Sequence, residues 1–162
     1  MIGDPQARLR SLMEAWRRDG AAGIRECMWA MPPVDQARLS IDLYNEGEID
    51  AMAAAIPDDF VHDMRPTGLP GMELYKGPEG YRRFLGEWLS AFPESRLEIE
   101  TIDEVGGRLF TVIRQQMRGA GSGVPVTFHY AGIFTFRDGR GAASEFHTDL
   151  EGARERFAAL SS

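Results

Sequence analysis

Three residues that can transfer a proton stand at alternate positions near the end of the chain, in the stretch SEFHTDLEG. They are Glu145, His147 and Asp149. Carboxylates and imidazole are common general acids and bases in enzymes, so the spacing suggests acid–base chemistry. Asp149 also directly precedes a helical pattern, and we expect it to cap that helix rather than to catalyse. Glu145 and His147 share one face of the predicted last strand, so the orientation of that strand decides their role.

The charge of the chain restricts its partners. The formal net charge is −7, with 25 acidic against 18 basic residues. Nucleic acid and anionic membrane surfaces attract clustered positive charge, so we expect neither as a partner. The 43% of hydrophobic residues indicates a globular protein with a real core. A small organic molecule is the expected partner.

Cysteine and histidine usage argues against stabilising cross-links and metals. Cys27 is the only cysteine, so no disulfide can form within the chain, and the three histidines lack the spacing of zinc ligands. We expect no metal and no cofactor. The sequence shows no secretory leader and no apolar run as long as a membrane span, so we expect a cytoplasmic protein.

The candidate residues must be positioned by secondary structure, and the first elements that the sequence predicts are helices. Asp4 followed by Pro5 is typical of a helix start, and two helical stretches then end at the pair Pro32-Pro33. We therefore predict an N-terminal helical extension over residues 1–33 and a main domain over residues 34–162. The main domain opens with a helix, a break at Gly47 and a second short helix.

The middle of the chain predicts a short strand and an amphipathic helix. The strand is expected in PDDFVHDMRP, and a loop rich in Gly and Pro, TGLPGMELYKGP, follows it. The next helix carries an apolar stripe that includes Tyr81, Phe84 and Trp88. This stripe is expected to face the core.

The last third of the chain changes from a helical to an alternating pattern. Four strands are predicted in RLEIETIDEV, RLFTVIRQQMRG, VPVTFHYAGIFTFR and GAASEFHTD, joined by hairpin-type connections such as Asp138-Gly139. A short helix follows. Helices followed by an antiparallel meander predict an α+β domain in which a curved sheet wraps around a long helix.

This order of elements resembles the SnoaL-like branch of the nuclear-transport-factor-2-like superfamily. The resemblance rests on LYNEGEIDAMAAAIPDDFVHDM, YKGPEGYRRFL, FTFRDGR and TDLEGARERF, and it covers residues 34–160. It implies a cone-shaped curved antiparallel sheet wrapped around helices, with a pocket between them, commonly in a homodimer. The fold hosts cyclases, epoxide hydrolases, isomerases and noncatalytic binding modules, so it does not fix the function.

Ketosteroid isomerases of this superfamily use a tyrosine and a late aspartic acid as an oxyanion hole. By alignment these positions hold Ser40 and Gly132, and the position of the base holds Met64 or, with a slip of one residue, Asp63. The donors that stabilise the oxyanion are missing, so we do not expect that reaction.

Limonene-type epoxide hydrolases hold a water molecule with an Asp-Arg-Asp arrangement. Arg114 stands at the arginine position, whereas Gln116 and Phe146 replace the two aspartates and His62 stands at a tyrosine position. Polyketide cyclases also carry an acid where this chain has Phe146. Glutamine cannot act as a base, so any catalysis must use neighbouring groups.

The resulting candidates are stated with their alternatives. His62 is the proposed proton carrier, or a core histidine bonded to the backbone. Arg114, with Gln116, is expected to polarise a substrate oxygen, or else to form an ordinary ion pair. Glu145 or His147 adds a second acid or base only if a one-residue bulge turns them inward.

Four aromatic residues are predicted to bind the substrate together with Gln116. They are Tyr75, Trp88, Tyr130 and Phe146. The leading hypothesis is an enzyme that binds a mostly apolar organic molecule and catalyses cofactor-independent cyclisation, isomerisation or epoxide opening. The alternative is a noncatalytic small-molecule-binding or dimerisation module, which predicts a cavity with no inward ionisable residue except Arg114.

Overall fold

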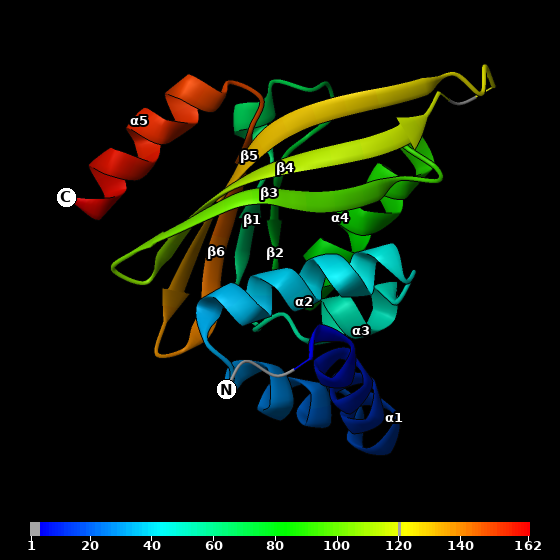
Figure 1. The fold of residues 1–162 in the computed structure, drawn as a ribbon, viewed down its shortest axis with the longest axis vertical. Coiled ribbons are helices and arrows are strands. Elements are labelled where there is room, and N and C mark those ends of the chain that lie inside the picture. Colours follow the sequence, from blue (N-terminus) through cyan, green and yellow to red (C-terminus); the bar gives the residue numbers. More distant parts are fainter. Residues whose placement is uncertain (1–3, 120) are drawn as a thin grey trace.

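A computed structural model describes residues 4–119 and 121–162, and these form five α-helices, one 3-10 turn and six strands (Figure 1). The N-terminal helical half comprises α1 (Pro5–Trp29), α2 (Pro33–Asn45) and α3 (Ile49–Ala54). It is followed by β1 (Val61–Asp63), the 3-10 turn η1 (Arg65–Thr67), β2 (Leu74–Lys76) and α4 (Gly77–Ala91). The last elements are β3 (Arg96–Val105), β4 (Arg108–Arg118), β5 (Pro125–Arg137), β6 (Arg140–His147) and α5 (Leu150–Ser161).

The N-terminal segment follows its local sequence signals. The Asp4 carboxylate accepts the backbone N–H of Gln6 at 3.1 Å, so it caps α1 as its position before Pro5 predicted. Gly20, with φ of 62°, interrupts α1, which explains the two helical stretches seen in the sequence. Residues 1–3 of the predicted extension lie outside the described residues.

The six strands form one curved, unclosed sheet in the order β2-β1-β6-β5-β4-β3 (Figure 1). The predicted α+β fold with a curved sheet around helices is thereby confirmed. One pair departs from the antiparallel expectation, because β1 runs parallel to β6. The strand β2 lies inside the Gly- and Pro-rich stretch that the sequence predicted as a loop, and its three residues pair with β1.

Strand pairing assigns each side chain to one of two faces. Pairs such as Ile113 with Tyr130 point to the inner face, towards α2, α3 and α4. Pairs such as Ile133 with Glu145 point to the outer face, where α5 packs. The pairing of β5 with β6 is continuous from Ala131 to Thr135, so the outer and inner sets do not exchange there.

Most of the core lies on the inner face. It combines the inner side of the sheet with the helix α4 stripe and with α1 residues, including Leu12, Ile24 and Met28. A smaller cluster on the outer face joins Phe110 and Ile133 to Ala153 of α5. Since α1 shares the main core, residues of the predicted extension pack as part of the same body.

Candidate functional site

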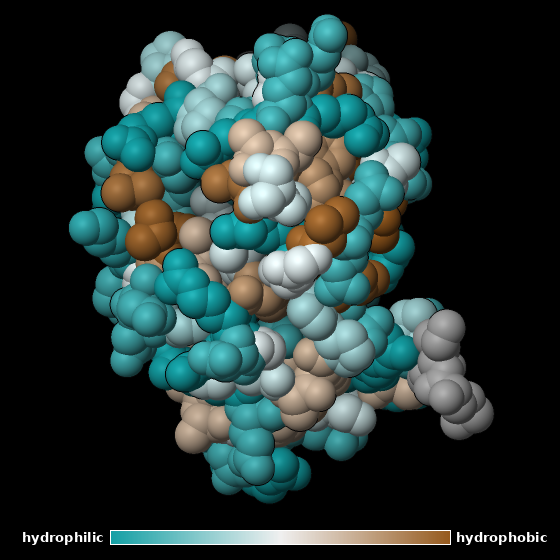
Figure 2. All heavy atoms as spheres, turned by 90° about the vertical axis from the view of Figure 1, so that its left-hand side faces the viewer, coloured by the Kyte–Doolittle hydropathy of each residue, from teal (hydrophilic) through white to brown (hydrophobic). Residues whose placement is uncertain are grey.

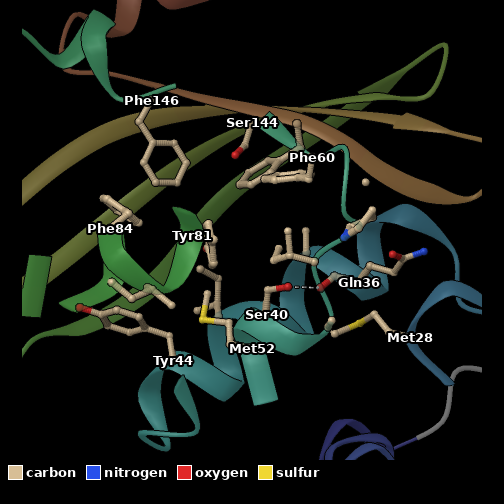
Figure 3. A pocket seen from close by; sticks show the side chains of 18 of the residues that line it. Met28, Gln36, Ser40, Tyr44, Met52, Phe60, Tyr81, Phe84, Ser144 and Phe146 are labelled. Carbon is tan, nitrogen blue, oxygen red and sulfur yellow. Dashed lines mark hydrogen bonds between the residues drawn. The ribbon is translucent and has the colours of Figure 1, made fainter. Parts of the chain in front are cut away.

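A cavity lies between the inner face of the sheet and helices α2, α3 and α4 (Figure 3). It encloses about 100 Å³, and partly exposed lining residues such as Ile56 and Phe136 bring it to the surface. An engineered cavity of roughly 150 Å³ holds benzene, so an enclosed ligand is limited to about one ring unless it extends through the opening.

The lining of the cavity is mostly apolar and carries no charged side chain. None of the described residues that line it is Asp, Glu, Lys, Arg or His. Three predicted substrate-binding residues, Trp88, Tyr130 and Phe146, do line it. Their position agrees with the expectation, and their role in binding stays a prediction.

Aromatic rings occupy the place of the missing acids. A Cβ atom at Gly132 would lie 2.8 Å from the Phe146 ring and 3.0 Å from the Phe134 ring. Any larger residue at position 132 therefore collides with the two rings that fill this end of the cavity. The cavity here is built around phenylalanine rather than around a carboxylate.

His62 lies behind the cavity wall rather than in it. Its side chain is 1% exposed, and its Nδ1 atom lies 2.5 Å from the Oγ atom of Ser144, which does line the cavity. The ring centroids of Phe84 and Phe146 lie 4.4 Å and 5.0 Å from the imidazole. The Nε2 atom has no hydrogen-bond partner among the described residues.

Burial keeps the imidazole of His62 neutral. Desolvation lowers its pKa from 6.5 to about 3, and the nearby Asp63 carboxylate opposes this shift only in part. At neutral pH a group with such a pKa is almost never protonated and is a weak base. His62 therefore lacks the basicity and the cavity access that a proton carrier needs.

Glu145 and His147 do not turn inward, so the condition for their role as a second acid or base is not met. No bulge shifts β6 at these positions, so both side chains face outward while Ser144 and Phe146 face the cavity. Glu145 accepts a bond from the Arg156 guanidinium of α5 at 3.1 Å, and His147 lies 3.5 Å from the same carboxylate. These groups connect the sheet to α5.

Arg114 and Gln116 also lie on the outer face, which corrects the expectation that they polarise a substrate oxygen. Arg114 pairs across the strands with His129 and forms an ion pair with Glu98. Gln116 is exposed. The alternative for Arg114, an ordinary ion pair, describes the observed geometry.

Tyr75 was predicted to bind the substrate, but it belongs to strand β2 and does not line the cavity. Its ring is buried, and its hydroxyl donates to the Glu87 carboxylate at 2.7 Å. Burial and this carboxylate raise the pKa of Tyr75 to about 12. The Arg83 guanidinium covers the ring at 4.7 Å from its centroid, so Tyr75 is held within a structural cluster.

The polar groups of the cavity are mostly hydroxyls, of which only that of Tyr130 belongs to a residue that the sequence predicted to bind the substrate. The hydroxyls of Tyr44 and Ser95 bond to each other, and burial raises the pKa of Tyr44. Burial also raises the pKa of Tyr81 and Tyr130, which line the cavity as well. Tyr81 was visible in the sequence only as part of the apolar helix stripe.

Helix α1 supplies one end of the cavity through Met28 and Trp29. The Trp29 indole N–H donates to the Ala55 carbonyl at 3.2 Å. Arg25 donates to the carbonyls of Ala54 and Ile56 at 2.9 Å and 2.8 Å. These bonds fix the end of α1 against the last residue of α3 and the two residues after it, so the N-terminal segment helps to build the site.

Surface and composition features bear on other partners. No helix in the described ranges is long and apolar enough to cross a membrane, and residues 4–119 and 121–162 contain no cluster of three or more His, Cys, Asp or Glu that could hold a metal. The face shown in Figure 2 is mostly hydrophilic, with hydrophobic residues in small separate groups. The expected homodimer stays a prediction.

The fold and the cavity place the protein in a known class. The SnoaL-like domain matches residues 37–143, which is more than half of the chain. The chain therefore belongs to the SnoaL-like domain family. A search of curated proteins found no significant match.

Solved structures agree in fold at low sequence identity. A cystatin-fold protein from Novosphingobium aromaticivorans is 21% identical, with a TM-score of 0.59, covering 72% of this chain and 97% of its own. TerC, co-crystallised with polyporic acid, is 19% identical with a TM-score of 0.62 (77% and 97% covered). The epoxide hydrolase/cyclase-like enzyme SalBIII is 15% identical with a TM-score of 0.56 (68% and 85% covered).

Proposed function

We propose that this domain binds a compact, uncharged, mostly apolar molecule with a ring in the cavity between sheet and helices. The uncharged lining is the observation that carries this proposal. An ionised group loses several kcal/mol of hydration on burial without a partner, whereas apolar surface gains about 25 cal/mol per Å². The site therefore selects against ions and for apolar rings.

The hydroxyls of the cavity define the polar part of the ligand. Burial raises the pKa values of Tyr44, Tyr81 and Tyr130, so at neutral pH all three remain protonated donors. A ligand with one acceptor oxygen satisfies such donors best. TerC, a relative in fold, was crystallised with polyporic acid, which supports a small organic ligand.

Cofactor-independent acid–base catalysis, namely cyclisation, isomerisation or epoxide opening, is the second candidate. It is favoured by the contact between His62 and Ser144, where a buried imidazole lies within hydrogen-bonding distance of a lining hydroxyl. SalBIII is named as an epoxide hydrolase/cyclase-like enzyme in pyran ring formation, which supports this candidate at the level of fold. The low pKa of His62 and the outward Glu145 favour binding over catalysis.

Acetophenone is a suitable probe of binding, because it has one ring and one acceptor oxygen. The three tryptophans report the location, since Trp29 and Trp88 line the cavity and Trp16 does not. In ¹⁵N-labelled protein, acetophenone is expected to shift the indole signals of Trp29 and Trp88 in a saturable manner and to leave Trp16 unchanged. Absence of saturable shifts up to the solubility limit contradicts the proposal.

The catalytic candidate is tested with the same compound. An acid–base catalyst of this kind accelerates the exchange of the acetophenone methyl hydrogens for deuterium in D₂O. We expect no acceleration above buffer with the wild-type protein. Acceleration that disappears in His62→Gln, with retained acetophenone binding, decides for the enzyme.

A further inference from the structure

The hydroxyl of Ser144 lines the cavity and contacts the buried side chain of His62. We infer that the Ser144 hydroxyl is the donor that recognises an acceptor oxygen of the ligand, and that His62 positions it by keeping its own proton on Nδ1. This inference rests on the proposed binding function and adds the chemical class of the ligand: a ketone, aldehyde, ester, ether or epoxide.

The geometry begins with two buried side chains. Ser144 is 3% exposed and lines the cavity, and its Oγ atom lies 2.5 Å from Nδ1 of His62, which is 1% exposed (Figure 3 shows the serine). The register that pairs His62 of β1 with Ser144 of β6 places them side by side. Two neighbouring parallel strands thus fix the contact.

The proton of His62 has two possible places, because the buried ring is neutral. If Nε2 carries it, an N–H group is buried among the rings of Phe84, Phe146 and Tyr81 without a partner. If Nδ1 carries it, only a lone pair is left unpaired there. Orphaned buried N–H groups are rarer than unpaired acceptors, so the Nδ1–H form is favoured.

The orientation of the serine hydrogen follows from this tautomer. When Nδ1–H donates to Oγ, the Ser144 hydrogen needs another acceptor, and the contact with His62 is the hydrogen bond that its hydroxyl forms among the described residues. The hydrogen therefore points into the cavity. Ser40 differs, because its hydroxyl already donates to the Gln36 carbonyl at 3.0 Å.

The tautomer is measured in the unmodified protein by long-range ¹H–¹⁵N correlation of the histidine rings. His129→Gln and His147→Gln variants assign the signals, since both histidines lie on the outer face. We expect a protonated Nδ1 and a bare Nε2 for His62. A protonated Nε2 overturns the inference, whether or not any ligand binds.

The donor is measured with a pair of compounds of the same shape. Acetophenone carries an acceptor oxygen where α-methylstyrene carries a CH₂ group, so the ratio of their affinities reports the hydrogen bond. We expect the wild-type protein to prefer acetophenone by about 5-fold, which corresponds to one net hydrogen bond. The preference is expected to fall below about 2-fold in Ser144→Ala and to persist in Ser40→Ala.

The outcomes separate the two proposals. If neither compound binds the wild-type protein, the proposed function fails and the ring correlation still decides the tautomer. If both bind and Ser144→Ala keeps the preference while Tyr81→Phe or Tyr130→Phe loses it, a tyrosine is the donor and the inference is overturned. Should Ser144→Ala fail to fold, the wild-type protein alone still tests the inference. If it binds acetophenone no more tightly than α-methylstyrene, the inference is contradicted.

Discussion

The two faces of strand β6 differ although their residues alternate along one short segment. Ser144 and Phe146 point inward to an uncharged cavity, whereas Glu145 and His147 point outward, where Glu145 bonds to Arg156 of α5. The same division continues on β4, where Ile113 is buried inside and Arg114 pairs with Glu98 outside.

This difference teaches that ionisable residues near a predicted pocket need not belong to it. On a curved sheet the concave face buries apolar side chains, and the convex face leaves room for ion pairs and a covering helix. The candidate acids and bases of the C-terminal stretch are thus structural groups of the outer layer. Only His62 among the proposed catalytic residues remains near the cavity.

The largest predicted difference between the faces concerns two adjacent residues of β4. Ile113→Ala is expected to lower the free energy of unfolding by about 2–5 kcal/mol, because it leaves a cavity in the inner core. Arg114→Ala is expected to lower it by less than about 1 kcal/mol, because its ion pair is partly exposed. Denaturant unfolding of both variants measures this, and equal losses contradict the assignment of faces.

A second prediction concerns acid stability. The pKa of His62 is lowered to about 3 in the folded protein, against 6.5 without burial, so between these values the unfolded chain binds a proton that the folded protein does not. The free energy of unfolding therefore falls as the pH falls, by about 2 kcal/mol between about pH 7.5 and 5. Above this range the contribution of His62 to stability is fully present. The loss is measured as the difference between wild-type protein and His62→Gln. Parallel pH curves contradict a buried neutral imidazole.

A third prediction concerns the helix that covers the outer face. Asp149 accepts the backbone N–H of Gly152 at 3.2 Å and caps α5. Asp149→Ala is expected to cost about 1 kcal/mol of stability, and Asp149→Asn, an equally good cap, only a few tenths. Thermal unfolding compares the three proteins. A loss in Asp149→Asn as large as in Asp149→Ala indicates a role for the charge instead of the cap.

The smallest expected effect concerns the ligand affinity of variants on the outer face of β6. Because Glu145 and His147 point away from the cavity, Glu145→Gln and His147→Gln are expected to change the affinity for acetophenone less than about 2-fold. Titration calorimetry measures this. A loss of 10-fold or more in either variant, with unchanged stability, returns these residues to the site.

The sequence predicted the elements well because their signals are local. The cap at Asp4, the end of helical structure before Pro33, the turn at Asp138-Gly139 with positive φ at both residues, and the cap at Asp149 all depend on neighbouring residues. The family resemblance then supplied the curved sheet. It could not supply β2, whose three residues are extended only because they pair with β1.

The site was predicted less completely because it depends on non-local pairing. Family alignment placed His62 near the cavity, yet the register of β1 with β6 puts Ser144 between the imidazole and the ligand. The face of Arg114 depends on its pairing with His129, which residue types alone do not fix. Alternation along β5, which puts Tyr130 and Phe134 on the inner face, is a signal in the sequence that could have located the lining.

The most direct test of the uncharged cavity compares acetophenone with benzoate, which has nearly the same shape and a negative charge. If the inner face binds an uncharged ring, acetophenone binds saturably and benzoate binds at least about 100-fold more weakly at neutral pH, because its carboxylate finds no cation in the lining. Benzoate binding as tight as acetophenone, or tighter, contradicts the account.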